Sequence, residues 1–414
     1  MFVNFVRYVF FPLAKWSLIF LSPLLSKKVK QLVRDKRKPQ FQSNRTPRPG
    51  QPIWVHAASG EVEYARPVLR ELSRLLPQCP LLVTYTSPSA IRILRNIPEA
   101  DWWGAAPWDT PWDVENFIEQ WRPRVALFAR TDVWPNTAFT LQRHGIPSLL
   151  FSATFSPTSS RLSSLSAIIT EASLNKLNMI YCVSNVDRSL LFSKLKISTP
   201  VEVRGDTRFD QVFYRLDHPK PVRSIELPSK QIIVAGSTWP EDEEVLLPAL
   251  RALPEVRLLL APHEIHPERI VELEQKLARL GMSFQLYSQA NRWESDVLIL
   301  DEIGILAEIY RWGDVAFVGG SFRRQVHSVM EPLACGLPVL VGPYHQNNRE
   351  AVELQNQIYP VRAVVAVQSE RELIEQLKIW LNTRPTKEQI RNLIQGQMGA
   401  SLAVAEWCQK SAPV

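Results

Sequence analysis

The sequence has little of what would build a disulfide framework, a zinc site or a phosphate-binding glycine loop. Its four cysteines lie far apart and form no C-x-x-C pair, which argues against disulfides and zinc and favours a reducing compartment. No G-x-x-x-x-G-K-[ST] loop and no G-x-G-x-x-G after a first strand is present, so kinase-like, ATPase and dinucleotide-binding functions lose their main support. No D-x-D follows an apolar strand to hold a metal-bound nucleotide diphosphate. These absences favour a function that needs neither a metal ion nor a cofactor.

The length of the chain, 414 residues, exceeds what a single core usually holds, so we expect two domains. From Gln51 onward, helical patterns alternate with short runs that are apolar on both faces, as in a buried parallel sheet. The runs are "PIWVHAA", "PLLVTYT", "RVALFAR", "SLLFSAT", "MIYCVS" and "VEVRGD", then "QIIVAGS", "VRLLLAP", "DVLILD", "VAFVGGS" and "PVLVGP". They predict an α/β protein with two Rossmann-like doubly wound domains, at 49–218 and 219–414, after an N-terminal segment at 1–48. We expect the last helix to pack back on the N-terminal domain.

The net charge of +7 at first suggests a nucleic-acid partner, but its distribution argues against one. Residues 1–48 hold eleven lysines and arginines against one acid, Asp35, a net of +10, which leaves −3 for the rest of the chain. The basicity is therefore local to the N-terminus.

The N-terminal stretch "MFVNFVRYVFFPLAKWSLIFLSPLLSKKVK" is apolar enough to enter a membrane. No small-residue cleavage site follows it, which disfavours a signal peptide. At about 100° per residue, Asn4, Arg7, Lys15 and Ser22 share one sector roughly 80° wide. A narrow cationic stripe on an apolar helix favours an anchor that lies in the membrane interface, with the following lysines against anionic headgroups. A membrane-spanning helix and a helix packed on its own domain are the alternatives.

In doubly wound sheets, ligands bind outside the carboxyl ends of the strands. Polar residues gather at those positions in both halves, which predicts a cleft between the domains. They are Glu61, Arg130, Asp132, Asp206, Arg208, Ser237, Thr238, His263, Gly320, Ser321, His327 and Glu331. The acidic run "PEDEE" at 240–244 has a simpler interpretation, because carboxylates at a helix start favour the helix dipole.

Several longer motifs resemble those of a known family. They are "VHAASGEVEYARP", "DVWPN", "GDTRFD", "AGSTWPEDEE", "APHEIHPERI", "VAFVGGS" and "MEPLACGLPVLVGP". Over essentially its whole length, the chain resembles the 3-deoxy-D-manno-octulosonic acid (Kdo) transferases. These are membrane-associated glycosyltransferases of the two-domain GT-B fold that build the inner core of lipopolysaccharide. The resemblance implies transfer of Kdo from CMP-Kdo to a lipid A precursor, at the cytoplasmic face of the inner membrane of a Gram-negative-type bacterium.

The resemblance makes Glu61 the general base, which accepts the proton of the attacking sugar hydroxyl. Direct displacement of CMP then implies inversion at the anomeric carbon. The alternative is that Glu61 is a first-turn acid that favours the helix dipole. Relatives usually read H-x-x-S-x-G-E, whereas this chain reads "HAASGE", one residue shorter, and such a turn would shift the carboxylate.

Three further residues match catalytic positions of the family. Asp132 takes the place of an acid before the Trp-Pro pair, one methylene shorter than the usual glutamate. The resemblance gives Arg130 and Arg208 the task of steadying developing negative charge. Surface or interdomain ion pairs are the alternative for both arginines.

The resemblance assigns the donor nucleotide to the second domain, where helix N-termini and small residues suit phosphate and ribose. The matching positions are Ser237, Thr238, Pro262, His263, Ile303, Gly304, Ile305, Gly320, Ser321, His327, Ser328, Glu331, Asn347 and Glu350. We expect His327 and Glu331, four residues apart, to share one helix face, with Glu331 binding ribose hydroxyls. Ser328 replaces an amide of the family motif.

The acceptor side departs from the family. Relatives carry arginines after the strand that here reads "LLFSAT", and this chain has Thr154 and Thr158 there. The basic linker is another source of cations for lipid phosphates. Two other functions stay open, a GT-B enzyme with a different nucleotide sugar and a catalytically weak paralogue that binds lipids or aids assembly.

Overall fold

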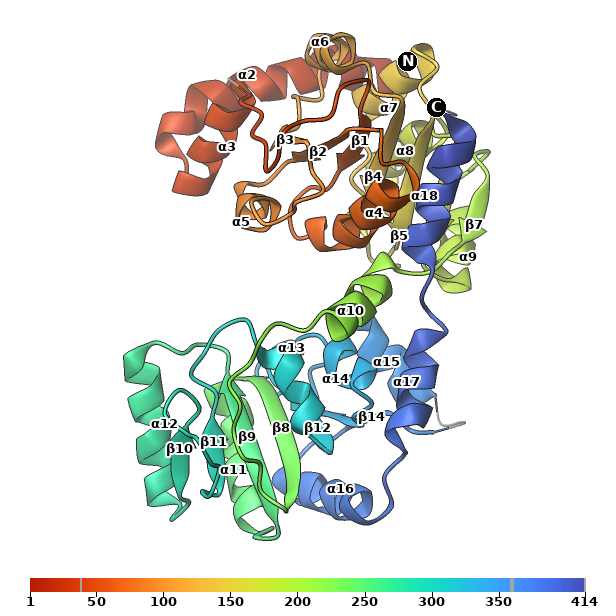
Figure 1. Ribbon diagram of the computed structural model, residues 1–414. Coiled ribbons are helices and arrows are strands. Elements are labelled where there is room, and N and C mark those ends of the chain that lie inside the picture. Colours follow the sequence, from red (N-terminus) through yellow and green to blue (C-terminus); the bar gives the residue numbers. More distant parts are fainter. Residues whose placement is uncertain (38, 358–360, 413–414) are drawn as a thin grey trace. The chain divides into compact units, whose positions relative to one another are not determined.

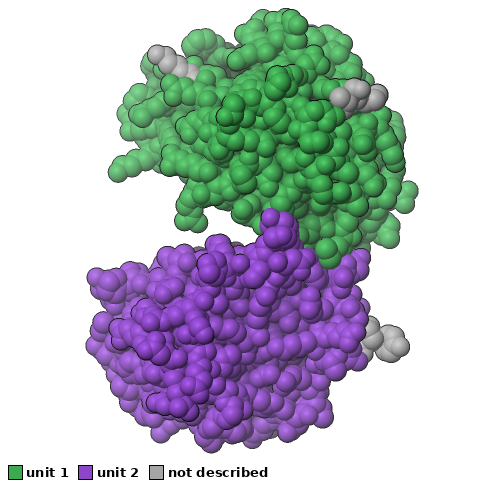
Figure 2. Space-filling model, in the orientation of Figure 1, with its two compact units in different colours: residues 1–211, 397–414 green, residues 212–396 purple. Residues whose placement is uncertain are grey.

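The chain forms two compact units, each built around one seven-stranded sheet (Figures 1 and 2). The structure, a computed structural model, describes residues 1–37, 39–357 and 361–412. Unit 1 comprises residues 1–211 and 397–414, and unit 2 comprises residues 212–396. The prediction of two doubly wound α/β domains is confirmed. The division falls at residue 211, seven residues before the position that the sequence pattern suggested, and the chain returns to unit 1 at residue 397.

The sheet of unit 1 is parallel throughout. Its strands, in spatial order, are β3 (Trp102–Ala105), β2 (Leu81–Tyr85), β1 (Ile53–His56), β4 (Val125–Ala129), β5 (Ser148–Ala153), β6 (Met179–Cys182) and β7 (Val201–Val203). Side chains of β1 alternate between two buried clusters. Ile53 and Val55 join one, and Trp54 joins the other, as expected of a strand covered on both faces.

The helices of unit 1 cover both faces of this sheet. They are α4 (Val62–Leu75), α5 (Ile91–Leu94), α6 (Pro111–Trp121), α7 (Pro135–Arg143), α8 (Ser164–Leu174), α9 (Asn185–Lys194), α10 (Thr207–Asp217, which crosses into unit 2) and α18 (Ala400–Ser411), with 3₁₀ turns at Pro88–Ala90 and Ser160–Leu162. Proline supplies the first residue of α6 and α7, where its missing N–H costs nothing. The last helix, α18, lies against α4 (Figure 1) and adds Val404, Ala405 and Cys408 to the core of unit 1.

The sheet of unit 2 repeats the parallel design. Its strands, in spatial order, are β10 (Phe284–Leu286), β11 (Val297–Ile299), β9 (Val256–Pro262), β8 (Gln231–Thr238), β12 (Val315–Val318), β13 (Val339–Val341) and β14 (Val364–Ala366). The helices are α11 (Pro240–Arg251), α12 (Pro267–Arg279), α13 (Leu306–Ile309), α14 (Met330–Ala334), α15 (Arg349–Asn356), α16 (Glu370–Thr383) and α17 (Lys387–Gln395), with a 3₁₀ turn at Tyr310–Trp312.

The strand order fixes where each sheet can bind a ligand. In unit 1 the connections run outward from β1 on one side and from β4 on the other. In unit 2 they run outward from β12 on one side, and on the other side they pass from β8 to β9 and the edge strand β10 before β11 fills the place between those two. Adjacent loops diverge at these two switch points, and the divergence leaves a crevice beyond the carboxyl ends of the strands.

The N-terminal segment is one helical rod that lies on unit 1. It consists of α1 (Phe2–Phe5), a π-helical turn (Val6–Phe10), α2 (Phe11–Leu21) and a 3₁₀ turn (Ser22–Leu24). Residues 2–24 form a helix that is long and apolar enough to cross a membrane, but only 11% of its apolar window is buried. A second helix, α3 (Lys27–Arg37), follows and carries basic residues in its last turn.

The two cations of the rod face unit 1. Arg7 Nε donates to Asn136 Oδ1 at 3.1 Å, and the Arg7 guanidinium lies 3.8 Å from the centre of the Phe139 ring. Lys15 Nζ pairs with Asp113 at 2.7 Å. The opposite face exposes large apolar side chains to solvent. They are Phe5, Tyr8, Val9, Phe10, Leu13, Trp16, Phe20, Leu21 and Leu24, and we call them the apolar face.

Candidate active site

Glu61 is the residue that precedes α4, directly after β1. Its Oε2 accepts a hydrogen bond from the amide of Ser59 at 2.9 Å, so the short "HAASGE" turn folds the carboxylate back toward its own backbone. The other oxygen has no hydrogen bond within the described part of the chain. Glu61 is half-buried beside the switch point of unit 1. One of its carboxylate oxygens is therefore available to accept a proton.

Asp132, on the loop after β4, is held by a histidine and an arginine. Its Oδ2 lies 3.1 Å from His56 Nε2, and its Oδ1 accepts from Arg161 at 3.1 Å. Burial opposes ionisation of Asp132, but the hydrogen bond and charge of His56, together with Arg161, hold its pKa below the usual range. A carboxylate that stays ionised and has both oxygens occupied is a poor proton acceptor. The geometry therefore suits Asp132 to positioning rather than to proton transfer.

His56 is part of a buried chain of hydrogen bonds. Trp54 Nε1 donates to Thr84 Oγ1 at 2.7 Å, and that oxygen lies 2.9 Å from His56 Nδ1. Since the ionised carboxylate of Asp132 only accepts, His56 Nε2 carries a proton. This network orients Asp132 and Arg161 at the carboxyl edge of the sheet.

Tyr64 brings the two predicted arginines together. The Arg130 guanidinium lies 5.2 Å and the Arg208 guanidinium 4.7 Å from the centre of its ring. Arg208 also pairs with Asp206 at 2.7 Å, whereas Arg130 Nε is buried without a hydrogen-bond partner among the described residues. Tyr64 lies in the first turn of α4, three positions after Glu61, which precedes the helix.

Unit 2 has its own pocket, of about 270 Å³, at the switch point of its sheet. Five of the predicted donor-binding residues line it, namely Ser237, Gly304, His327, Ser328 and Glu331. Ser237 has a φ of 56° and Gly304 a φ of 89°, so the backbone is in the left-handed conformation on two sides of this pocket. For serine this conformation is strained, and such strain is concentrated at functional sites.

An aromatic stack stands beside this pocket. The His263 ring lies between Trp239 and His327, with 4.6 Å between ring centres on each side, and the Arg323 guanidinium covers the Trp239 ring at 3.9 Å. Trp239 Nε1 donates to His327 Nε2 at 3.3 Å, which requires that nitrogen to be unprotonated. Burial, and next the charge of His263, lower the pKa of His327. His327 is therefore neutral at pH 7, and the positive charge of this stack comes from Arg323.

The prediction that His327 and Glu331 share a helix face is wrong. Helix α14 begins at Met330, and His327 lies in the irregular segment before it. Asn348 Nδ2 holds the carbonyl of His327 at 2.8 Å, and Ser328 Oγ donates to Glu331. These hydrogen bonds pair polar groups of a segment that is not helical. The side chains of His327 and Glu331 nevertheless both line the pocket of unit 2.

Other predicted donor residues form hydrogen bonds within unit 2. Thr238 Oγ1 donates to Glu243 at 3.1 Å, and Asn347 Oδ1 accepts from the amide of Val326 at 3.0 Å. Asp242, from "PEDEE", accepts a hydrogen bond from the amide of Gly320 at 2.7 Å. Its carboxylate therefore makes a tertiary contact in addition to lying in the first turn of a helix. Of the rest, Ser321 and Glu350 are buried, Ile303 is exposed, Ile305 precedes α13, and Pro262 ends β9.

Among the residues that the structure describes, no group of three or more His, Cys, Asp or Glu side chains is placed to hold a metal ion. The residues that sequence reasoning did not select are His56, Tyr64, Arg161, Trp239 and Arg323. Two of them could have been found from the sequence. His56 stands at the end of a predicted strand, and Tyr64 lies three residues after Glu61, close to one helical turn.

Known proteins resemble the chain over most of its length. The family described as 3-deoxy-D-manno-octulosonic-acid transferase (kdotransferase) matches residues 31–211. A 3-deoxy-D-manno-octulosonic acid transferase of Haemophilus influenzae is 27% identical over 368 residues, which cover 85% of this chain and 84% of that protein. Both matches are to Kdo transferases, and together they make the chain similar to this family over most of its length. A family member from Bordetella pertussis is 28% identical over 325 residues, which cover 72% and 73% of the two chains.

Solved structures agree on the fold. A UDP-GlcNAc 2-epimerase from Neisseria meningitidis matches 86% of this chain and 99% of its own with a TM-score of 0.60 at 14% identity. A glycosyltransferase from Rickettsia africae matches 88% of this chain and 100% of its own with a TM-score of 0.55 at 13% identity. At such identities the likeness concerns the two-domain fold alone.

Proposed function

We propose that the protein transfers Kdo from CMP-Kdo to a lipid A precursor, with inversion, during synthesis of the lipopolysaccharide inner core. The observation that carries the proposal is the similarity of the chain to Kdo transferases over most of its length, together with the gathering of its candidate residues at both sheet switch points. The geometry supplies a carboxylate, two arginines and a separate small-residue pocket, as a transfer between an activated sugar and a hydroxyl requires.

Glu61 is the general base of the proposed reaction. A sugar hydroxyl is a weak nucleophile, and attack on the anomeric carbon becomes easier when a carboxylate takes its proton as the new bond forms. Glu61 has an oxygen available for this task, whereas both oxygens of Asp132 are occupied. The pair of arginines on Tyr64 offers positive charge to the carboxylate of Kdo or to a phosphate.

The pocket of unit 2 is the proposed site for the CMP part of the donor. Glu331 accepts hydrogen bonds from ribose hydroxyls, and the left-handed backbone at Ser237 and Gly304 lets the chain approach the nucleotide closely. Neutral His327 lines the pocket without adding charge.

The apolar face is the proposed membrane-binding surface. Because Arg7 and Lys15 are occupied by unit 1, the rod turns its cations inward and its large apolar side chains outward. A monotopic helix that buries one face among headgroups and acyl chains has this arrangement. The basic residues of α3 would then lie near anionic lipids of the inner membrane, on its cytoplasmic face.

A donor screen tests the proposal. The purified full-length protein is incubated with lipid A precursor in mixed micelles and with CMP-Kdo, CMP-sialic acid or a UDP-hexose in turn. We expect CMP release and a heavier acceptor with CMP-Kdo. Product formed from a UDP-sugar would assign a different transferase activity, and CMP binding without transfer would indicate the catalytically weak paralogue.

A further inference from the structure

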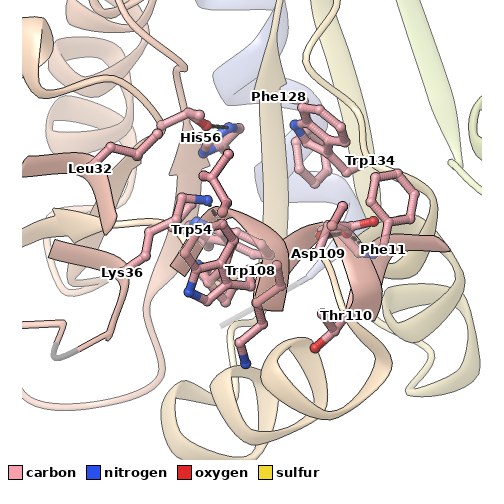
Figure 3. Close-up of a pocket in the computed structure, with 17 residues that line it drawn as sticks. Phe11, Leu32, Lys36, Trp54, His56, Trp108, Asp109, Thr110, Phe128 and Trp134 are labelled. Carbon is pink, nitrogen blue, oxygen red and sulfur yellow. Dashed lines mark hydrogen bonds between the residues drawn. The ribbon is translucent and has the colours of Figure 1, made fainter. Parts of the chain in front are cut away.

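Unit 1 contains a pocket of about 230 Å³ that the catalytic argument does not use (Figure 3). One wall comes from α2, through Phe11, Ala14 and Leu18. The opposite wall comes from the sheet and its loops and includes Trp54, Trp108, Phe128 and Trp134. The lining is predominantly apolar, and its aromatic rings surround the space from several elements.

Several polar groups at the margin of this pocket have partners, whereas Trp108 Nε1 is buried without a hydrogen-bond partner among the described residues. The Asp109 carboxylate accepts from the amides of Asn136 and Thr137 at 3.0 and 2.9 Å. Lys36 Nζ donates to the carbonyl of Pro107 at 3.1 Å, and Thr110 Oγ1 donates to Asp113. Because most of the lining is apolar and few of its polar groups lack a partner, the space suits an apolar chain with one polar linkage better than a sugar or a nucleotide.

The pocket adjoins two other surfaces of unit 1. The helix that forms its outer wall also carries the apolar face, so one side of α2 lines the pocket while the other is exposed. At the inner end stands His56, whose Nε2 lies 3.1 Å from Asp132 at the carboxyl edge of the sheet. The pocket therefore connects the proposed membrane-binding surface with the proposed catalytic edge.

We propose that this pocket holds part of one acyl chain of the lipid acceptor and thereby places the acceptor's sugar at the carboxyl edge of the sheet. The inference rests on the proposed function and adds to it the recognition of the lipid chain. An acyl chain reaches the pocket from the bilayer beside α2 without passing through water, so its methylenes stay in apolar surroundings throughout.

A filled pocket tests this proposal. Ala14→Phe places a ring in the space from the α2 wall, and Ser17→Phe, at an exposed residue one turn away that does not line the pocket, is the matched control. Transfer is measured with acylated lipid A precursor and with the same precursor after removal of its acyl chains. We expect Ala14→Phe to raise KM for the acylated acceptor at least fivefold and to leave the rate with the deacylated acceptor within twofold of wild type.

The outcomes separate the pocket from the chemistry. Equal kinetics of Ala14→Phe and Ser17→Phe with the acylated acceptor would overturn the acyl-chain proposal. A wild type that transfers to neither acceptor would instead contradict the proposed function.

A binding measurement needs no turnover. Tryptophan fluorescence is recorded in a Trp16→Phe background while a phospholipid with bromine in its acyl chains is added in micelles. Bromine quenches on contact, so the pocket tryptophans should be quenched, and Ala14→Phe should remove at least half of that quenching. Identical quenching with and without Ala14→Phe would also overturn the proposal.

Discussion

Both sheets are parallel and seven-stranded, but they carry different chemistry at their switch points. Each has a non-glycine residue in the left-handed conformation there, Arg130 with φ 63° in unit 1 and Ser237 with φ 56° in unit 2. In unit 1 the neighbouring side chains are charged and engage one another through Asp132, His56 and Arg161. In unit 2 the pocket is lined by small residues together with Glu331, beside a stack of aromatic rings that Arg323 covers on one side.

The difference indicates that the two units of the fold have separate tasks, the transfer step in unit 1 and nucleotide binding in unit 2. Charged groups that are fixed by their partners can respond to a proton or to developing charge without reorganising, which is the main electrostatic requirement of a transfer step. Small residues and free backbone suit a bound nucleotide. We therefore expect substitutions in unit 1 to change turnover and substitutions in unit 2 to change CMP affinity.

The largest effect is expected from Glu61→Gln. The amide keeps the shape of Glu61 but cannot accept a proton, so turnover should fall by about 10² to 10⁴ while the affinity for CMP is unchanged. Glu63→Gln is the matched control, because Glu63 lies in the same turn and forms only a partly exposed pair with Arg66. Near wild-type turnover of Glu61→Gln would remove the general-base role.

The second effect concerns the apolar face of unit 1. Changing Trp16, Phe20 and Leu24 to Glu should lower binding to vesicles of phosphatidylglycerol and phosphatidylethanolamine by about 10² or more, since each apolar side chain contributes roughly 1.5–3 kcal/mol when buried. The control changes three exposed apolar residues elsewhere, Val186, Val271 and Ile379, to Glu. Equal loss in a sedimentation assay would show that the apolar face has no special role.

The third effect tests unit 2. Glu331→Ala should weaken CMP binding by roughly 10- to 30-fold, the equivalent of one or two lost hydrogen bonds to a charged group, and should shrink the rise in Tm that CMP produces. UDP should stabilise the wild type far less than CMP. Glu375→Ala, which removes an exposed partner of Arg371, is the control. An unchanged CMP affinity in Glu331→Ala would move the donor away from this pocket.

The smallest effect is a loss of stability in unit 1. Asp132→Asn should destabilise the protein by about 1–3 kcal/mol at pH 7, because His56 and Arg161 lose their charged partner. The folded-state pKa of Asp132 is lowered, so its contribution is present above the usual Asp range near 4 and is lost as the pH falls below it. Denaturant unfolding at pH 7, 5 and 3 should show the difference from wild type shrink only at pH 3. A difference independent of pH would contradict the charged pairing.

Much of the fold could be predicted because buried central strands are apolar on both faces. The three strands that the pattern did not reveal, β3, β10 and β14, all lie at sheet edges. Strand β10 is only half-buried along its length and has no continuous apolar run, as an edge strand permits. Strands β3 and β14 are apolar and mostly buried, but they span only four and three residues. The candidate residues at strand ends were visible for a related reason, since parallel strands bring their carboxyl ends to one edge.

The pairings within the sites could not be predicted. Asp132 meets His56 and Arg161 from other segments, and Tyr64 meets Arg130 and Arg208. Such contacts depend on loop conformations that no local pattern encodes. The same holds for His327, because asparagines of a later loop keep its segment out of α14.

The central claim is that Glu61 assists a direct attack of the acceptor hydroxyl on the anomeric carbon of the donor. The anomeric configuration of the product, measured by NMR after transfer from CMP-Kdo by the wild type, tests it most directly. A single displacement predicts a configuration inverted relative to the donor. Retention would contradict the account, because it requires a covalent glycosyl intermediate or a front-side attack rather than base-assisted direct displacement.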